Sequence, residues 1–296
     1  MNVSPYLVLK SRILLLMATF FWGLTFIYVK EGTAITGVWS FLAWRFIIAA
    51  MLLLIIFLRR FRNLSQKTLI KGFFMGLLLA ASYLFQTIGL QTSTVAKAAF
   101  ITGLFVVFIP FFTALTSDHK PTKRQYLAAF ISFFGLAVMA FEGYEHISAG
   151  DLWVLACAVS FAIYVVWVSY ETPKHDSIQI TTIQLFTVGI VSAIGIIPAG
   201  NMAIPLSLPA WEAILFCAVF ATTFSYTIEN HYQKFISETE AGIIYSLEPV
   251  FAAGGAWILL SEMPALKVWI GAALILAGML SSISKKDGHQ STIEPD

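Results

Sequence analysis

The chain contains ten apolar stretches of about 20 residues, separated by short polar connections. Within a few residues at each end, they cover 12–30, 38–58, 72–91, 96–116, 125–141, 151–169, 179–198, 210–230, 241–260 and 267–284. A helix of about 20 apolar residues spans the hydrocarbon core of a bilayer. Only 11% of the 296 residues are charged and 58% are hydrophobic, whereas roughly a quarter are charged in soluble domains. We therefore predict an all-α integral membrane protein with ten transmembrane helices.

The distribution of Lys and Arg predicts the orientation of these helices. If the N-terminus is cytoplasmic, all but four of the eighteen Lys and Arg residues fall at the cytoplasmic side, as the positive-inside rule requires. The exceptions are Lys30, Lys97 and Lys267 on the opposite side and Arg45 within the second stretch. We expect both termini in the cytoplasm, with the polar tail 287–296 disordered.

The two halves of the sequence, 1–144 and 145–286, resemble each other. A shift of 143 residues places Ser82-Tyr83 on Ser225-Tyr226, and a shift of 140 places the first stretch on the sixth. Each half holds five expected helices, an odd number, so the second half would cross the membrane in the opposite direction. Inverted repeats of this kind are typical of secondary transporters, in which a midplane site opens to one side and then to the other.

One stretch, 242–260, carries a carboxylate and a proline in its middle. A bare carboxylate at this depth costs several kcal/mol, and Pro249 leaves the carbonyl of Tyr245 without its helical donor. Broken helices build polar sites in lipid, so Glu248 is expected to bind solute or a coupling ion. The alternative is a structural kink in which Glu248 caps free backbone groups. In the first half, Pro110 is the expected helix break.

Two further pairs of polar residues match across the repeat. Tyr83 and Gln86 share one helical face, as do Tyr226 and Glu229, because each pair is three residues apart. These side chains are predicted to serve as matched gates or binding groups. The alternative is an interfacial belt, since tyrosine and charge are ordinary at helix ends.

Arg45 and Trp22 complete the candidate site. Arg45 suits an anion clamp for a substrate carboxylate, although it could also anchor the helix by snorkelling or by a structural ion pair. Trp22 lies in mid-membrane, where it would form a cavity wall or pack against lipid. The shift of 143 also places Lys97 on Glu240, a reversal of charge that the sequence does not explain.

Three segments resemble a known family. The runs "FFWGLTFIYVK", "AWRFIIAA" and "AGIIYSLEPVFAAGGAWILLSE" are similar to the drug/metabolite transporter superfamily, EamA type. This resemblance implies a multi-pass carrier in the bacterial inner membrane that moves small metabolites, often by exporting amino acids or related compounds. It also implies a cavity lined by the first, third, fourth, sixth, eighth and ninth helices.

The expected partners are the lipid bilayer and a small polar or zwitterionic solute, such as an amino acid. An aromatic-rich cavity would also suit a nucleobase or a nucleoside-derived solute such as S-adenosylmethionine. A proton is a candidate coupling ion, acting through Glu248 or Glu229. The small residues of "ILAGML" in the last stretch could support a homodimer.

Other functions have less support in the sequence. A channel needs rings of polar groups along a pore, and few charges lie within the stretches. An intramembrane enzyme needs a clustered catalytic set, but the candidate histidines lie in connections or at helix ends: His119, His146, His175 and His231. No metal site, cofactor or nucleic-acid partner is expected, because metal spacing, nucleotide-binding loops and basic aromatic patches are missing from the sequence.

Overall fold

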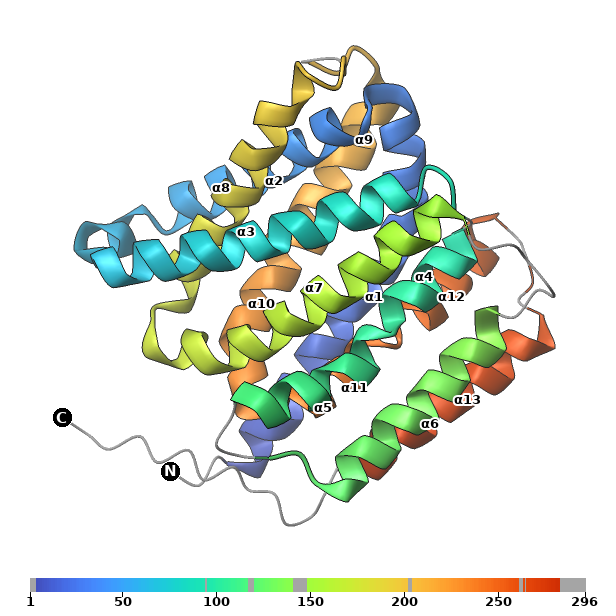
Figure 1. Cartoon of the computed structure of the whole chain (residues 1–296). Coiled ribbons are helices and arrows are strands. Elements are labelled where there is room, and N and C mark those ends of the chain that lie inside the picture. Colours follow the sequence, from blue (N-terminus) through green and yellow to red (C-terminus); the bar gives the residue numbers. More distant parts are fainter. Residues whose placement is uncertain are drawn as a thin grey trace.

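The computed structural model describes residues 4–93, 95–116, 120–140, 148–201, 204–260, 263 and 265–282. Throughout these residues the regular elements are helices, and Figure 1 shows them gathered in one bundle. Seven helical segments are long and apolar enough to cross a membrane, judged by length and composition. The predicted class, an all-helical membrane protein, agrees with this architecture.

The first half of the chain forms seven helical elements. They are α1 (Pro5–Thr36), α2 (Val38–Ile56), the 3-10 helix η1 (Leu58–Asn63), α3 (Gln66–Gly89), α4 (Val95–Gly103), α5 (Phe105–Thr116) and α6 (Lys123–Ala140).

The second half continues from residue 148 and also divides into short and long helices. They are α7 (Ala149–Glu171), η2 (Thr172–Lys174), α8 (Ser177–Ile196), α9 (Leu208–Phe216), η3 (Cys217–Phe224), α10 (Ser225–Tyr232), η4 (Gln233–Phe235), α11 (Glu238–Tyr245), α12 (Glu248–Leu260) and α13 (Leu266–Ser282). Helix or consecutive helices thus cover each of the ten expected stretches over their described residues.

Two of the stretches are interrupted at corresponding places. The chain turns at Leu104 between α4 and α5, and at Ser246 and Leu247 between α11 and α12. Pro249 is the second residue of α12, in the first turn, where the proline's lack of an N–H group costs little. Pro110, in contrast, lies inside α5, so the break expected there is found at Leu104 instead. Membrane helices tolerate an internal proline where neighbouring groups satisfy the freed carbonyl.

A π-helix interrupts the segment that runs from α9 to α10. Within η3, the Thr222 hydroxyl donates to the carbonyl of Cys217, five residues back, at 2.8 Å. Ser225 bonds to the Phe220 carbonyl in the same way, at 2.9 Å. The wider turn rotates the side chains that follow it, and such π segments are frequent at functional sites.

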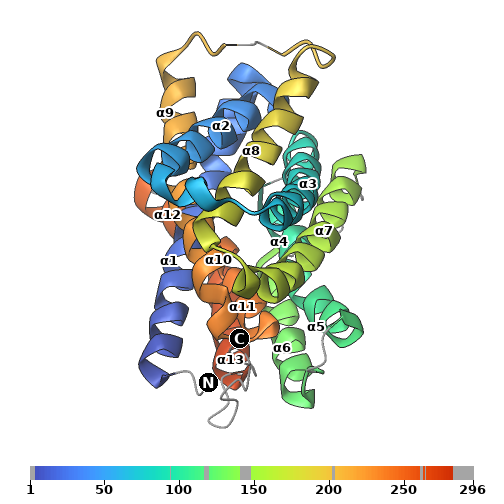
Figure 2. The same cartoon turned by 90° about the vertical axis from the view of Figure 1, so that its left-hand side faces the viewer.

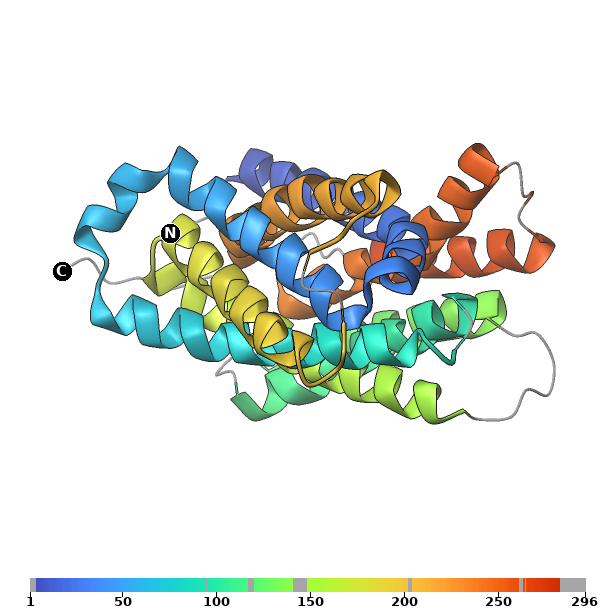
Figure 3. The ribbon, with the colours of Figure 1, turned by 90° about the horizontal axis from the view of Figure 1, so that it is seen from above.

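The halves pack together through α2 against α8 and α6 against α13. Figures 1 and 2 show α6 and α13 side by side, and Figure 3 shows this pair at one end of the molecule. A Cβ atom on Gly135 would lie 2.6 Å from the Gly271 carbonyl oxygen, and one on Gly278 would lie 2.9 Å from that of Ala128. A shift of 143 exchanges these two contacts. Gly278, part of "ILAGML", therefore packs against α6 of the same chain.

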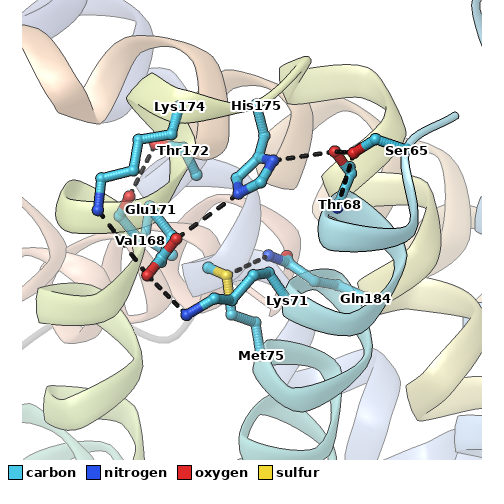
Figure 4. Close-up of polar contacts among 10 residues, drawn as sticks. All are labelled: Ser65, Thr68, Lys71, Met75, Val168, Glu171, Thr172, Lys174, His175 and Gln184. Carbon is cyan, nitrogen blue, oxygen red and sulfur yellow. Dashed lines mark hydrogen bonds and ion pairs between the residues drawn. The ribbon is translucent and has the colours of Figure 1, made fainter. Parts of the chain in front are cut away.

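Ion pairs join α3 to the end of α7 at one end of the bundle (Figure 4). The Glu171 carboxylate is 3.0 Å from Lys71 Nζ and 3.6 Å from His175 Nε2. His175 Nδ1 is hydrogen-bonded to the Thr68 hydroxyl at 2.9 Å. Glu171 is buried, whereas the Lys71 side chain is 43% exposed.

This difference in exposure predicts unequal losses of stability. Lys71→Met leaves a buried carboxylate without its nearest donor and should cost about 1–3 kcal/mol. Glu171→Gln leaves an ammonium group that water can reach, so the cost should be smaller. Urea unfolding in detergent, followed by circular dichroism, would measure both. Equal losses, or a larger loss for Glu171→Gln, would contradict this assignment.

Candidate functional site

A cavity lies within the bundle. The centres of water-sized molecules have about 40 Å³ there, and the empty volume of about 580 Å³ includes space open to solvent. Its walls come from α1, α3, α4, α7, α10 and α12, with one residue from α2. These are the helices that the family resemblance implied, together with α2. The lining includes every expected binding residue except Glu229: Trp22, Arg45, Tyr83, Gln86, Tyr226 and Glu248.

Arg45 is the only lining residue from α2, and its side chain points into the bundle. It is 2% exposed. Its Nε donates to the Thr222 hydroxyl at 2.8 Å, and its Nη2 donates to the Tyr83 hydroxyl at 3.3 Å. The guanidinium also lies over the rings of Phe46 and Tyr83, at 5.2 and 4.9 Å from their centroids. The Arg45 guanidinium is thus held in place and does not snorkel to the membrane surface. It is a fixed cation at the cavity wall.

Tyr83 and Tyr226, which match across the repeat, meet at the cavity. The Tyr226 hydroxyl donates to the Tyr83 hydroxyl at 2.9 Å, across a sequence separation of 143 residues. Two equivalent residues touch in this way only near the axis that relates their halves. Because Tyr83 accepts from both Tyr226 and Arg45, its own O–H remains available to donate into the cavity.

Glu248 stands at the start of α12, with its side chain facing the cavity. Among the described residues its carboxylate has no hydrogen bond or ion pair. A Cβ on Gly23 would lie 2.6 Å from the Glu248 carbonyl oxygen, so α1 and α12 touch at this point. The absence of a side chain at Gly23 lets the two helices approach closely and sets the position of Glu248.

Aromatic side chains form another part of the wall. The Trp22 indole is 5% exposed and donates to the Ala221 carbonyl at 2.7 Å. Its ring lies 5.4 Å from that of Tyr226 and 6.4 Å from that of Phe161. Trp22 therefore lines the cavity rather than facing lipid. Gln86 also lines the cavity and donates to the Thr102 hydroxyl at 3.2 Å.

Glu229 lies apart from the cavity. It is fully buried, and neither carboxylate oxygen has a hydrogen-bond partner among the described residues. It does not belong to an interfacial belt, because nothing of it reaches the surface. A buried carboxyl without a partner is costly and needs an explanation.

Several residues in and near this region are missing from the sequence-based predictions. Thr222, which holds Arg45, gave no signal because its place depends on the π-helix η3. Asp151 pairs with Lys97 at 2.7 Å. The capping box that begins at Ser148 could have indicated Asp151. The side chains of Gln233 and Tyr245, which are hydrogen-bonded to each other at 2.8 Å, were also not predicted as part of a site.

The histidines do not assemble a catalytic set in the part of the chain described. His175 Nδ1 is hydrogen-bonded to the Thr68 hydroxyl and its Nε2 lies 3.6 Å from the Glu171 carboxylate, and His231 Nδ1 is hydrogen-bonded to the Ser177 hydroxyl at 2.9 Å. His119 and His146 lie outside the described residues. No described group of three or more His, Cys, Asp and Glu residues is placed to hold a metal ion.

Helices of membrane-spanning length around a central cavity with polar, charged and aromatic walls are the features of a membrane transporter. The model of the EamA-like transporter family matches the chain twice, over residues 9–141 and 148–284. The chain belongs to the EamA-like transporter family, within the drug/metabolite transporter superfamily.

Individual relatives agree with this assignment. A transporter of Archaeoglobus fulgidus is 28% identical over 267 residues, which cover 90% of this chain and 83% of the relative. The transporter YyaM of Bacillus subtilis is 26% identical over 289 residues, with 93% of each chain covered. One solved crystal structure superposes with a TM-score of 0.78 at 17% identity, over 92% of this chain and 96% of the other. That last likeness concerns the fold alone.

Thr222 gives a direct test of how Arg45 is held. Thr222→Val removes the hydroxyl that accepts from Arg45 Nε, so the guanidinium loses its orientation. A lost hydrogen bond to a charged group should weaken binding of the transported solute about tenfold. Thr222→Ser keeps the hydroxyl and is the matched control. Isothermal titration in detergent would compare the three proteins, and equal affinity of Thr222→Val and the unaltered protein would contradict this role.

Proposed function

We propose that the chain is a secondary transporter that moves a small zwitterionic metabolite, such as an amino acid, by alternating access. The observation that carries this proposal is the cavity itself, which has a fixed guanidinium at Arg45 and an unpaired carboxylate at Glu248. Arg45 would bind the solute's carboxylate and Glu248 its ammonium group. Opposite charges on one cavity wall match a solute that carries both charges.

The proposed topology has ten transmembrane helices in two inverted halves, with both termini cytoplasmic. Three observations support it: the distribution of Lys and Arg, the two successive matches of the family model, and the contact of Tyr83 with Tyr226 across 143 residues. The proposed location is the bacterial inner membrane, with export as the direction of transport.

A nucleobase or nucleoside-derived solute, such as S-adenosylmethionine, is the second candidate. The aromatic walls favour it, because Trp22, Phe26 and Phe161 all line the cavity and would stack against a planar base. S-adenosylmethionine also carries the carboxylate and ammonium groups that Arg45 and Glu248 would bind. A solute screen must therefore include both classes.

Transport assays in proteoliposomes would test the proposal. We expect saturable uptake and counterflow of one solute class, because a carrier binds its solute in each cycle. A channel would instead pass unsaturated unitary currents, and an enzyme would change its solute chemically. If no labelled amino acid or nucleoside exchanged, the solute part of the proposal would be wrong.

The binding roles can be separated by two variants. Glu248→Gln should raise the KM for a zwitterion at least tenfold, and Arg45→Lys should do the same, because each weakens a charge-assisted pair. Glu31→Gln, which alters an exposed carboxyl of α1, should leave transport unchanged. If Glu248→Gln had unaltered kinetics, the binding role of Glu248 would be wrong and its role at the start of α12 would be structural.

A further inference from the structure

The wall of the open cavity has a closed counterpart in the other half of the chain. Four lining residues of α3, the turn after it and α4 are Gln86, Thr87, Leu90 and Thr102. A shift of 143 places them on Glu229, Asn230, Gln233 and Tyr245. These four counterparts are all completely buried. Thr87, Leu90 and Thr102 are themselves only 1–4% exposed, so the two sets differ in whether they line the cavity. The repeat thus relates one set that lines the cavity to one set that does not.

Hydrogen bonds of Gln233 tie this buried set to α7 and α11. Its Nε2 donates to the Val165 carbonyl at 2.7 Å and to the Ser169 hydroxyl at 2.6 Å. Its Oε1 accepts from the Tyr245 hydroxyl at 2.8 Å. The shift of 140 relates Val165 and Ser169 to Thr25 and Val29 of α1, which line the open cavity. Gln233 therefore fills the space that corresponds to the open one.

Two ion pairs correspond across the repeat to within one residue. The shift of 143 relates Lys97 to Glu240, and the shift of 140 places Ser11, next to Arg12, on Asp151. Arg12 of α1 pairs with Glu240 of α11 at 2.5 Å, and Lys97 of α4 pairs with Asp151 of α7 at 2.7 Å. Both pairs join the first helix of one half to the fourth stretch of the other half, with the charges exchanged. This explains why Lys97 falls on Glu240 in the repeat. The Arg12 and Glu240 side chains are 26% and 10% exposed, so this pair reaches the protein surface, whereas Gln233 is completely buried.

Glu229 is the one position where the two sets differ in formal charge, because its counterpart Gln86 is a neutral amide. The titratable side chains within electrostatic range of it are Tyr83, Tyr164, Tyr226 and Tyr245. Among the described residues no basic group reaches its carboxylate. Closing the protein over an unpaired carboxylate is costly unless a positive charge or a proton goes with it.

We propose that Glu229, Asn230, Gln233 and Tyr245 form a second binding face of the transport pathway, which opens toward the end of the bundle that holds Arg12. Glu229 is its binding site for a positive group, either a proton or the ammonium group of the solute. This inference rests on the proposed alternating access. A positive group bound at Glu229 then favours closure of this face, because the closed state buries the carboxylate and the positive group neutralises it.

Cysteine labelling tests the second face without any solute. Thr87→Cys reports on the open cavity and Asn230→Cys on its counterpart, each in a background with Cys157 and Cys217 replaced by Ala. We expect Arg12→Gln to increase labelling of Asn230→Cys severalfold, from the face that holds Arg12, and to decrease labelling of Thr87→Cys. Arg60→Gln breaks the exposed Arg60–Asp176 pair and is the matched control, expected to change neither.

The reciprocal change is what distinguishes a second face from loosened packing. If labelling at both positions rises, or if Asn230→Cys stays unreactive in Arg12→Gln, the proposal is overturned. Because the assay needs no transported solute, it can succeed even if the proposed cargo is wrong. It can equally fail while the transport assays succeed.

The role of Glu229 is tested by Glu229→Gln. If the site binds a proton, proton-driven uptake is lost while solute counterflow persists. If it binds the solute's ammonium group, the KM in counterflow rises at least tenfold as well. Either result supports the proposal, and unchanged uptake and counterflow would overturn it. Glu229→Leu should also raise the unfolding temperature in detergent, because it removes an unpaired buried carboxyl; a fall would indicate a structural role.

Discussion

The contact between the hydroxyls of Tyr83 and Tyr226 is the point on which the rest of the site depends. It joins α3 to α10 at 2.9 Å, and Tyr83 in turn accepts from Arg45. A cation this deeply buried persists only where hydrogen bonds and aromatic rings replace its water. The pair of tyrosines thus links the two halves at the cavity and helps to keep a positive charge at its wall.

Helix interruptions supply the other requirement of a polar site in lipid. Backbone polar groups must be satisfied internally, so irregular turns occur only where protein or a water-filled cavity surrounds them. The turns at Leu104 and Leu247 lie 143 residues apart, and the second delivers Glu248 to the cavity. The π-helix η3 places Thr222 against Arg45. The turn at Leu247 and the π-helix therefore both place polar groups at or next to the cavity wall.

The asymmetry of the site arises from side chains placed on a symmetric frame. The contacts of Gly135 and Gly278 are interchangeable by the repeat, whereas Arg45 has no charged counterpart, since shifts of 140 and 143 lead to Leu185 and Val188. The shift of 143 likewise places the neutral Gln86 on the carboxyl group of Glu229. Under the proposed alternating access, a symmetric frame would give two faces that open in turn, and their unequal charges would make the two faces bind differently.

The sequence by itself determined the membrane class, the approximate helix positions, the repeat and six of the fifteen residues of the cavity wall, because hydrophobic length and isolated polar residues are local signals. Only the tertiary structure decided that Arg45 points inward, that the first break lies at Leu104 rather than Pro110, and that Asp151 is the partner of Lys97. It also separated Glu229 from the cavity that Gln86 lines. These outcomes depend on which helices touch, and no local pattern of residues encodes such long-range contacts.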